Sequence, residues 1–142
     1  MSVDAGSYRD RAQPESLRGR ALSISLTVKD LQQSLKWYRD VLGFVVDREY
    51  ERDGKPFGVS LKAGSVAILI NQDDGAKGAN RVKGEGISFM ITTAQSVDEI
   101  AKRVKDNGGT LDMEPTDMRW GTRAFRLRDP DGFKLTISSE RT

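Results

Sequence analysis

Cysteine and histidine are both absent from the 142 residues of this chain. Without cysteine the chain has no disulfide, no thiolate nucleophile and no cysteine-ligated zinc site. Without histidine it lacks the usual general base, the Ser-His-Asp triad and the commonest ligand of zinc, iron and nickel. Any catalysis must therefore use carboxylates, lysine, tyrosine or a bound cofactor.

Long apolar runs are absent as well. Nothing approaches the roughly 18 consecutive apolar residues of a membrane-spanning helix, and the N-terminus has no apolar signal-peptide core. The 23 basic and 21 acidic residues are interspersed and leave a net charge of +2, which gives no support for a nucleic-acid-binding surface. We therefore expect a cytoplasmic globular protein with neither nucleic acid nor a membrane as partner.

The most informative segment that is present is a hairpin near the C-terminus. Two stretches of alternating apolar and polar residues flank the turn Asp-Pro-Asp-Gly at 129–132, in which Pro130 presets φ and Gly132 tolerates positive φ. The alternation assigns one face to the core: Phe125, Leu127, Phe133, Leu135 and Ile137. The opposite face, which could line a cavity, carries Ala124, Arg126, Lys134, Thr136 and Ser138.

One pattern of elements occurs twice along the chain. In the first half, a strand at 23–28 is followed by a helix that Asp30 caps and Gly43 ends, and by strands at 44–51, 57–63 and 66–71. In the second half, a strand at 87–91 precedes a helix from Ser96 to Gly108 and strands at 110–114, 123–128 and 134–138. Gln33 and Glu99 are the expected capping-box partners of the two N-caps. The pattern predicts an α+β fold with tandem βαβββ units.

The predicted organisation is an arm followed by one domain. The domain covers residues 21–142, with units at 21–72 and 85–140. The polar, aperiodic residues 1–20 are either disordered or dock on a dimer partner through Tyr8 and Leu17.

The chain resembles the vicinal oxygen chelate superfamily, which groups glyoxalases, extradiol dioxygenases, fosfomycin-resistance enzymes and bleomycin-binding proteins. The resemblance is carried by residues 28–31, 37–44 and 129–132, and it extends over residues 21–140. It implies paired, curled mixed sheets in which each unit surrounds a cavity, and it implies a homodimer whose two chains share those cavities.

The resemblance also implies where a metal would bind in metal-dependent members, whose ligands come from four strand positions. Those positions fall on Ser23, near Ile68, on Gly86 or Ser88, and on Thr136. None of these residues offers the charged or imidazole donor that offsets dehydration of a divalent ion. We therefore expect no metal and no other cofactor.

Three further residues could contribute to a cavity. If the sheet curls, a buried Arg126 could bind a carboxylate, phosphate or enolate bidentately, although it could equally face solvent. Trp120 could close the cavity over an aromatic ligand, or simply pack in its loop. Met90 could adapt to an irregular ligand, or belong to the core.

The preferred hypothesis is a non-metal protein that sequesters a small, partly apolar or aromatic molecule, as bleomycin-resistance proteins do. The predicted ligand-binding residues are Ser23, Ser25, Ile68, Ser88, Met90, Trp120, Arg126 and Thr136. The alternative is a glyoxalase- or dioxygenase-related lyase or isomerase that uses carboxylate acid/base chemistry beside Arg126 or metal ligands at other positions. A third possibility is a regulatory partner protein with a vestigial cavity.

Overall fold

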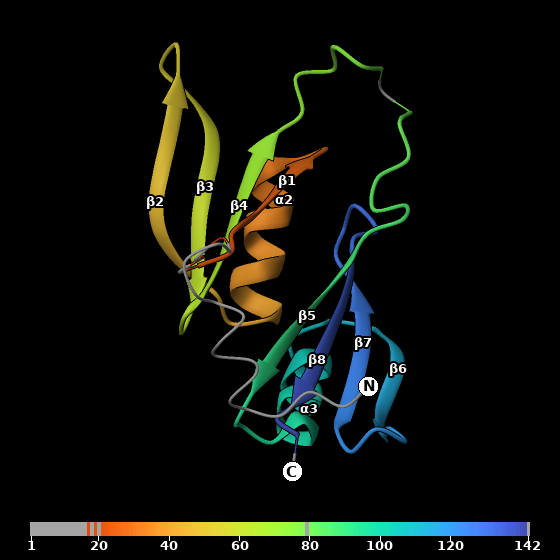
Figure 1. Cartoon of the computed structure of the whole chain (residues 1–142). Coiled ribbons are helices and arrows are strands. Elements are labelled where there is room, and N and C mark those ends of the chain that lie inside the picture. The colour runs from red at the N-terminus through yellow and green to blue at the C-terminus, as the bar shows by residue number, and fades with distance from the viewer. Residues whose placement is uncertain (1–16, 18, 20, 79, 142) are drawn as a thin grey trace.

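A computed structural model of the chain describes residues 17, 19, 21–78 and 80–141, and it contains two successive βαβββ units (Figure 1). The first unit consists of β1 (Ile24–Val28), α2 (Leu31–Lys36), η1 (Trp37–Val41), β2 (Val45–Arg52), β3 (Lys55–Ala63) and β4 (Val66–Gln72). The second consists of β5 (Ser88–Thr93), α3 (Val97–Asp106), β6 (Leu111–Asp117), β7 (Arg123–Arg128) and β8 (Lys134–Ser139). This order confirms the predicted repeat.

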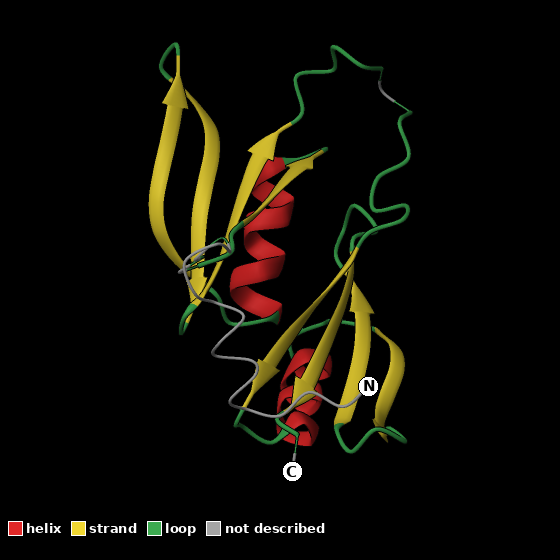
Figure 2. Cartoon of the chain, in the orientation of Figure 1, coloured by secondary structure: helices red, strands yellow, loops and turns green. Residues whose placement is uncertain are grey.

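Each unit folds into one four-stranded mixed sheet, as Figure 2 shows. The first sheet has the order β1-β4-β3-β2, and the second has the equivalent order β5-β8-β7-β6. In both, the first strand of the unit lies parallel to the last, and the remaining neighbours are antiparallel. A parallel pair needs a long crossover connection, and the rest of the unit, helix included, provides it. The α+β prediction is therefore confirmed.

The two helices begin at the predicted caps. The Asp30 carboxylate accepts a hydrogen bond from Gln33 N at 3.1 Å, and the Ser96 hydroxyl accepts one from Glu99 N at 3.3 Å. The first helix ends at Gly43 as predicted, but its last turn is π-helical: α2 continues into η1, where Leu42 N bonds Trp37 O at 3.4 Å. Gly43 follows with φ of +82°, the left-handed conformation that terminates helices.

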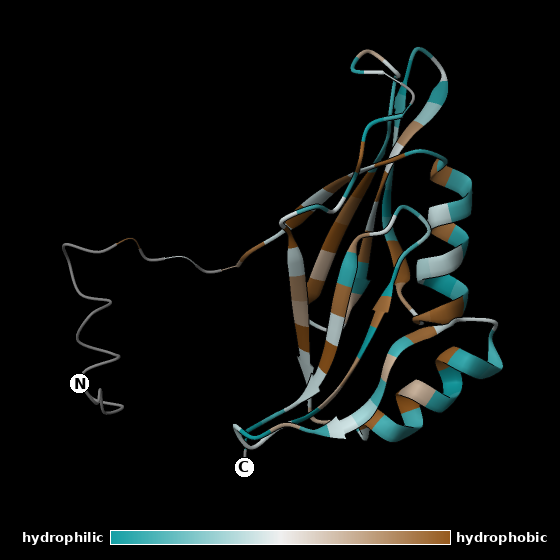
Figure 3. Cartoon of the chain, turned by 90° about the vertical axis from the view of Figure 1, so that its right-hand side faces the viewer, coloured by the Kyte–Doolittle hydropathy of each residue, from teal (hydrophilic) through white to brown (hydrophobic). Residues whose placement is uncertain are grey.

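The core lies between the layer of strands and the layer of helices, which Figure 3 shows side-on. Apolar side chains from both units join in one buried cluster, with Tyr38 fully buried among them. The predicted core residues of the C-terminal hairpin are buried, but so are Ala124 and Ser138, each 2% exposed. These two were expected on the open, polar side of the hairpin. They lie directly opposite each other on β7 and β8.

The 129–132 turn connects the second unit to the first. One oxygen of Asp129 accepts the N–H groups of Asp131 and Phe133, both at 2.9 Å, as expected of a turn residue. The other oxygen accepts the Tyr38 hydroxyl of the first unit at 2.7 Å. Burial raises the pKa of Asp129 and of Tyr38, and the three donors to Asp129 act against that rise at the carboxylate.

Asp131 makes the same connection from the other side of the turn. It accepts Lys29 N at 2.8 Å, and its second oxygen lies 3.4 Å from the Ser34 hydroxyl. Lys83, in the link between the units, lies 3.7 Å from Asp131 and donates to Asp73 at 2.8 Å. The sequence explained both turn aspartates by the turn alone, and the structure adds their contacts with the first unit. We call residues 129–132 with Tyr38 and Lys83 the turn cluster.

The predicted arm at 1–20 lies outside the described residues, apart from Leu17 and Gly19. Leu22, two residues before β1, is 94% exposed. Within the part of the chain that the structure describes, no helix is long and apolar enough to cross a membrane.

Candidate functional site

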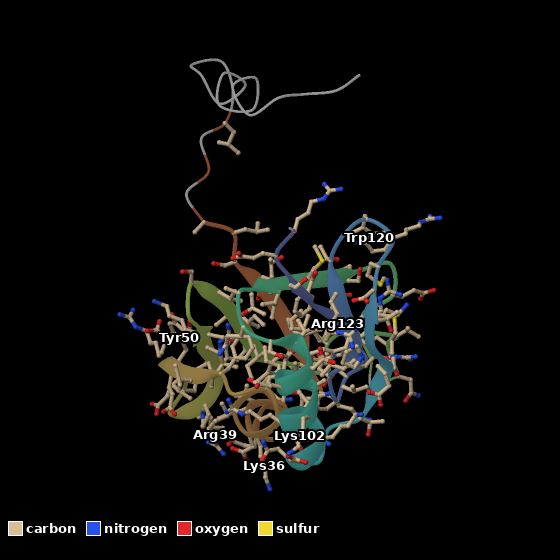
Figure 4. All side chains as sticks on the ribbon, turned by 90° about the horizontal axis from the view of Figure 1, so that it is seen from below. Lys36, Arg39, Tyr50, Lys102, Trp120 and Arg123 are labelled. Carbon is tan, nitrogen blue, oxygen red and sulfur yellow. The ribbon has the colours of Figure 1, made fainter. Side chains whose placement is uncertain are left out.

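Each sheet has a core face, which packs against the helices, and an open face on the opposite side. In Figure 4 the helices lie at the bottom with Lys36, Arg39 and Lys102, while Trp120 lies on the side of the open faces. The open face of the second sheet is hollowed to a volume of about 390 Å³. We call this the second-sheet hollow; it is lined by Ser88, Asp112, Met113, Arg126, Leu127, Arg128, Lys134, Leu135 and Thr136.

The strand register arranges the side chains of the hollow in rows. One row runs across the sheet through Met113, Arg126, Thr136 and Met90, because each residue is paired with the next on the neighbouring strand. In a regular antiparallel pair such as Arg126 and Thr136, the two Cβ atoms are about 4.5–5.5 Å apart. The adjacent row, nearer the 129–132 turn, consists of Arg128, Lys134 and Ser88. The hollow therefore combines thioether and hydroxyl groups with three cations.

Only one of these cations is paired within the described chain. The Arg128 guanidinium donates to the Asp112 carboxylate at 2.8 Å. Arg126 and Lys134 have no ion pair among residues 17, 19, 21–78 and 80–141. Asp112 is also the one carboxylate among the described residues that line the hollow. The hollow is therefore positively charged, and two of its cations are directed at solvent.

On the open face of the first sheet, two neutral polar side chains form a hydrogen bond with each other. Asn71 donates to the Ser25 hydroxyl at 2.9 Å, between the paired strands β4 and β1. The side-chain oxygen of Asn71, Oδ1, lies over Gly58 on β3. A Cβ at position 58 would come within 2.5 Å of this oxygen. Gly58 therefore gives Asn71 the space to reach Ser25. These neutral groups bond to each other.

The structure brings some of the predicted site residues together. Ser88, Arg126 and Thr136 line the second-sheet hollow. Met90 lies beside Thr136 on the same face and is 63% exposed, so it does not belong to the core. Ser25 lies on the open face of the other sheet, and Ser23 immediately precedes β1.

Two further predicted residues lie outside the hollow, and for a third the structure decides between the two interpretations left open by the sequence. Ile68 is 1% exposed and lies on the core face opposite Ile24, so it lines no open face. Trp120 lies in the connection between β6 and β7, at the end of those strands away from the 129–132 turn, and is not among the residues of the hollow. Arg126 is exposed, whereas the sequence suggested a buried guanidinium if the sheet curled.

The residues at the four strand positions where the family resemblance implies metal ligands do not fit a divalent ion. The open-face neighbours of Ile68 are Ala67 and Leu69, which offer no donor either. Ser23, Ser88 and Thr136 offer only hydroxyl groups, which do not offset the dehydration of a divalent ion. Across the described residues, no three His, Cys, Asp or Glu side chains converge on one point. We derive no chemistry from a metal at these positions.

Sequence reasoning missed several functional candidates. Lys134 was placed on the open face by its alternation but was not selected as a site residue. Asp112 and Arg128 form a pair that joins β6 to β7, and Asn71 reaches Ser25 across 46 positions of sequence. The alternation of β7 and β8 could have indicated the cations. Nothing in a single sequence indicates the pairings.

Comparisons with known proteins give the family. The profile of the Glyoxalase/Bleomycin resistance protein/Dioxygenase superfamily matches residues 20–137. The lactoylglutathione lyase of Salmonella typhimurium is 25% identical over 124 residues, which are 83% of this chain and 90% of that protein.

Solved structures show the same fold. A member of this superfamily from Sphaerobacter thermophilus superposes with a TM-score of 0.71 at 23% identity, covering 87% of this chain and 98% of the other. TioX from Micromonospora sp. ML1 superposes with a TM-score of 0.66 at 18% identity, covering 86% and 97%. With the repeated βαβββ units and the matching profile, the chain belongs to the Glyoxalase/Bleomycin resistance protein/Dioxygenase superfamily.

Proposed function

We propose that the chain binds a small, partly apolar or aromatic molecule in the second-sheet hollow, without a metal ion. The observation that carries this proposal is the composition of the hollow and of the row of paired residues that crosses it. Met113 and Met90 offer apolar, adaptable surface directly beside the polar groups of Thr136 and Arg126. Small-molecule sites combine apolar surface with polar groups that fix the orientation of the ligand, and their volumes begin at about 300 Å³. With six polar or charged residues among the nine that line it, the hollow is more polar than most such sites.

The proposed mechanism is sequestration, as in the bleomycin-resistance branch of the family. Binding removes the apolar body of the ligand from water, and one or two polar contacts fix its orientation. The alternative is a lyase or isomerase that uses a carboxylate beside Arg126. The carboxylate that lines the hollow, Asp112, is bonded to Arg128, which supports binding over acid/base catalysis.

Methionine methyl NMR tests the location of the site. We would label the methionine methyl groups with ¹³C and add 2-naphthol as a neutral aromatic probe. The proposal predicts shifts at Met113, which lines the hollow, and at Met90, which is paired with Thr136 of the hollow, but not at Met118 in the connection between β6 and β7. Shifts confined to Met118, or no saturable shift at any methionine, would overturn the proposal.

Two measurements test the enzymatic alternative. One is elemental analysis of the purified protein for zinc, nickel, iron and manganese. The other is an assay of lactoylglutathione lyase activity, the activity named for the relatives, with and without added divalent metal. The proposal predicts neither stoichiometric metal nor metal-dependent activity. Lactoylglutathione lyase activity would establish the alternative, and stoichiometric metal without activity would overturn the metal-free site.

We further propose that the protein is a homodimer in which the open faces of two chains complete shared cavities. Support comes from the large apolar side chains exposed at or beside the open faces, such as Leu22, Ile87 and Met90. Sedimentation equilibrium should give twice the 15.8 kDa mass of the chain. A monomer at micromolar concentration would contradict the shared cavity and leave the hollow as a single-chain site.

A further inference from the structure

We infer that the ligand of the second-sheet hollow carries an acidic group, and that Arg126 and Lys134 select it. This inference rests on the proposed function and adds the charge of the ligand and its orientation. It begins from Arg128 and Lys134, which are directly opposite each other on β7 and β8. Like charges in that arrangement destabilise a sheet.

The chain compensates for part of this positive charge. Asp112 neutralises Arg128 through a 2.8 Å hydrogen bond. Lys134 and Arg126 stand diagonally across the same two strands, one row apart, and have no carboxylate partner in the described chain. Two cations therefore remain on one wall of a hollow of about 390 Å³. An anion placed between them would relieve their repulsion and gain charge-assisted hydrogen bonds.

The geometry also orients the ligand. The planar fork of a guanidinium matches a carboxylate or a phosphate in a bidentate pair, and a lysine ammonium adds a point charge. Lys134 is two residues past Gly132, so the acidic group lies at the end of the hollow nearest the 129–132 turn. Arg126 occupies the next row, in which Met113 and Met90 offer apolar surface. The apolar body of the ligand therefore extends across these two methionines.

Probes of one shape and different charge test the inference. We would titrate the protein at pH 7 with 2-naphthoate, 2-naphthyl phosphate, 2-naphthol and 2-naphthylmethylamine, following the Met113 methyl signal. We expect 2-naphthoate or 2-naphthyl phosphate to bind at least about tenfold more tightly than 2-naphthol. The comparison of the two anions distinguishes a carboxylate from a phosphate ligand. The protonated amine should bind most weakly.

Matched variants assign the effect to the two residues. Arg126→Gln and Lys134→Gln should each lower affinity for the preferred anion at least about fivefold while leaving 2-naphthol within about twofold. Lys36→Gln removes the same charge from the helix side of the molecule and should leave both affinities unchanged (Figure 4). A merely global electrostatic effect would lower anion affinity equally in all three variants.

The outcomes separate the inference from the function on which it rests. Equal binding of anionic, neutral and cationic probes, with shifts at Met113, would overturn the acidic ligand and leave the binding function intact. Anion binding that survives both substitutions would overturn the assignment to Arg126 and Lys134. A failure of all four probes to shift Met90 or Met113 would overturn the binding function itself.

Discussion

The hairpin of β7 and β8 carries two polar regions that differ in how their charges are satisfied. In the turn cluster, both oxygens of Asp129 and both oxygens of Asp131 have hydrogen-bond donors within the chain. In the second-sheet hollow, a few residues along the same strands, Arg126 and Lys134 have no carboxylate partner in the described chain.

This difference suits the turn cluster to stabilising the fold and the second-sheet hollow to binding a ligand. A buried polar group is costly unless it is fully bonded, so the turn aspartates can lie between the units only with every donor in place. An exposed cation is solvated and costs little without a partner. The hydrogen bonds of the turn cluster therefore join the two units, and the unpaired cations of the hollow can bind a ligand.

The largest expected effect comes from breaking the turn cluster. Asp129→Ala removes the acceptor of the Tyr38 hydroxyl and of two backbone N–H groups, so it should lower the free energy of unfolding by about 3 kcal/mol or more. Tyr38→Phe removes a single bond and should cost about 1–2 kcal/mol. Urea unfolding followed by circular dichroism measures both. A loss below about 0.5 kcal/mol for Asp129→Ala would mean that the turn does not join the units.

A glycine in the link tests how closely that segment packs on the turn. Gly84 has φ of +76°, and a Cβ there would lie 2.8 Å from Gly132 O. We expect Gly84→Ala to lower the free energy of unfolding by about 2–3 kcal/mol, from backbone strain and the clash together. Gly54 has the same φ with no atom within 4 Å of the added Cβ, so Gly54→Ala measures the strain alone. Equal losses in the two variants would show that the packing of Gly84 contributes nothing.

Acid titration should distinguish the carboxylates paired with Lys83 and Arg123 from the buried Asp129. Hydrogen bonds from Lys83 and Arg123 hold the pKa of Asp73 and of Asp98 below the ordinary range. A lowered pKa contributes stability that is present at neutral pH and is lost as pH falls below about 4. Burial raises the pKa of Asp129, so protonation of this residue acts in the opposite direction.

Urea unfolding between pH 7 and about pH 3 measures this dependence. The loss on acidification should be smaller in Asp73→Asn and in Asp98→Asn than in the parent chain, because each variant lacks one of the groups that titrate. An unchanged slope in both variants would contradict the assignment of these two pairs.

The smallest expected effect on stability comes from the hollow. Arg126→Gln and Lys134→Gln remove charges that repel one another, so each should change the free energy of unfolding by less than about 0.5 kcal/mol. A loss as large as that of Tyr38→Phe would show that these cations have partners that hold the fold. The comparison between the two regions would then fail.

Local sequence signals predicted most of the fold. The alternation located all eight strands to within a few residues, and Asp30 and Ser96 marked the helix starts because capping acts over three positions. Ile68 shows the limit of this reasoning. A shift of one residue moves a strand side chain to the opposite face, and the position inferred from relatives was one residue from the open-face positions Ala67 and Leu69.

Contacts between distant residues could not be predicted from the sequence. Tyr38 meets Asp129 across 91 positions, and neither local propensity nor spacing links a helix tyrosine to a turn aspartate. The cations of the hollow were visible in the alternation of β7 and β8. Only the alignment of the strands in the sheet shows that Arg126 and Lys134 have no carboxylate partner in the described chain. The proposed role of these two residues in binding an acidic ligand depends on that absence.

Urea unfolding of Arg126→Gln with and without 2-naphthoate tests most directly whether Arg126 contributes to binding and not to stability. A ligand that binds only the folded state stabilises it by RT ln(1 + [L]/Kd), so at one ligand concentration tighter binding gives a larger rise of the unfolding midpoint. We predict an unchanged midpoint without 2-naphthoate and a markedly smaller rise with it than in the parent chain. A lowered midpoint without 2-naphthoate, together with an undiminished rise in its presence, would contradict the division of this hairpin into a holding region and a binding region.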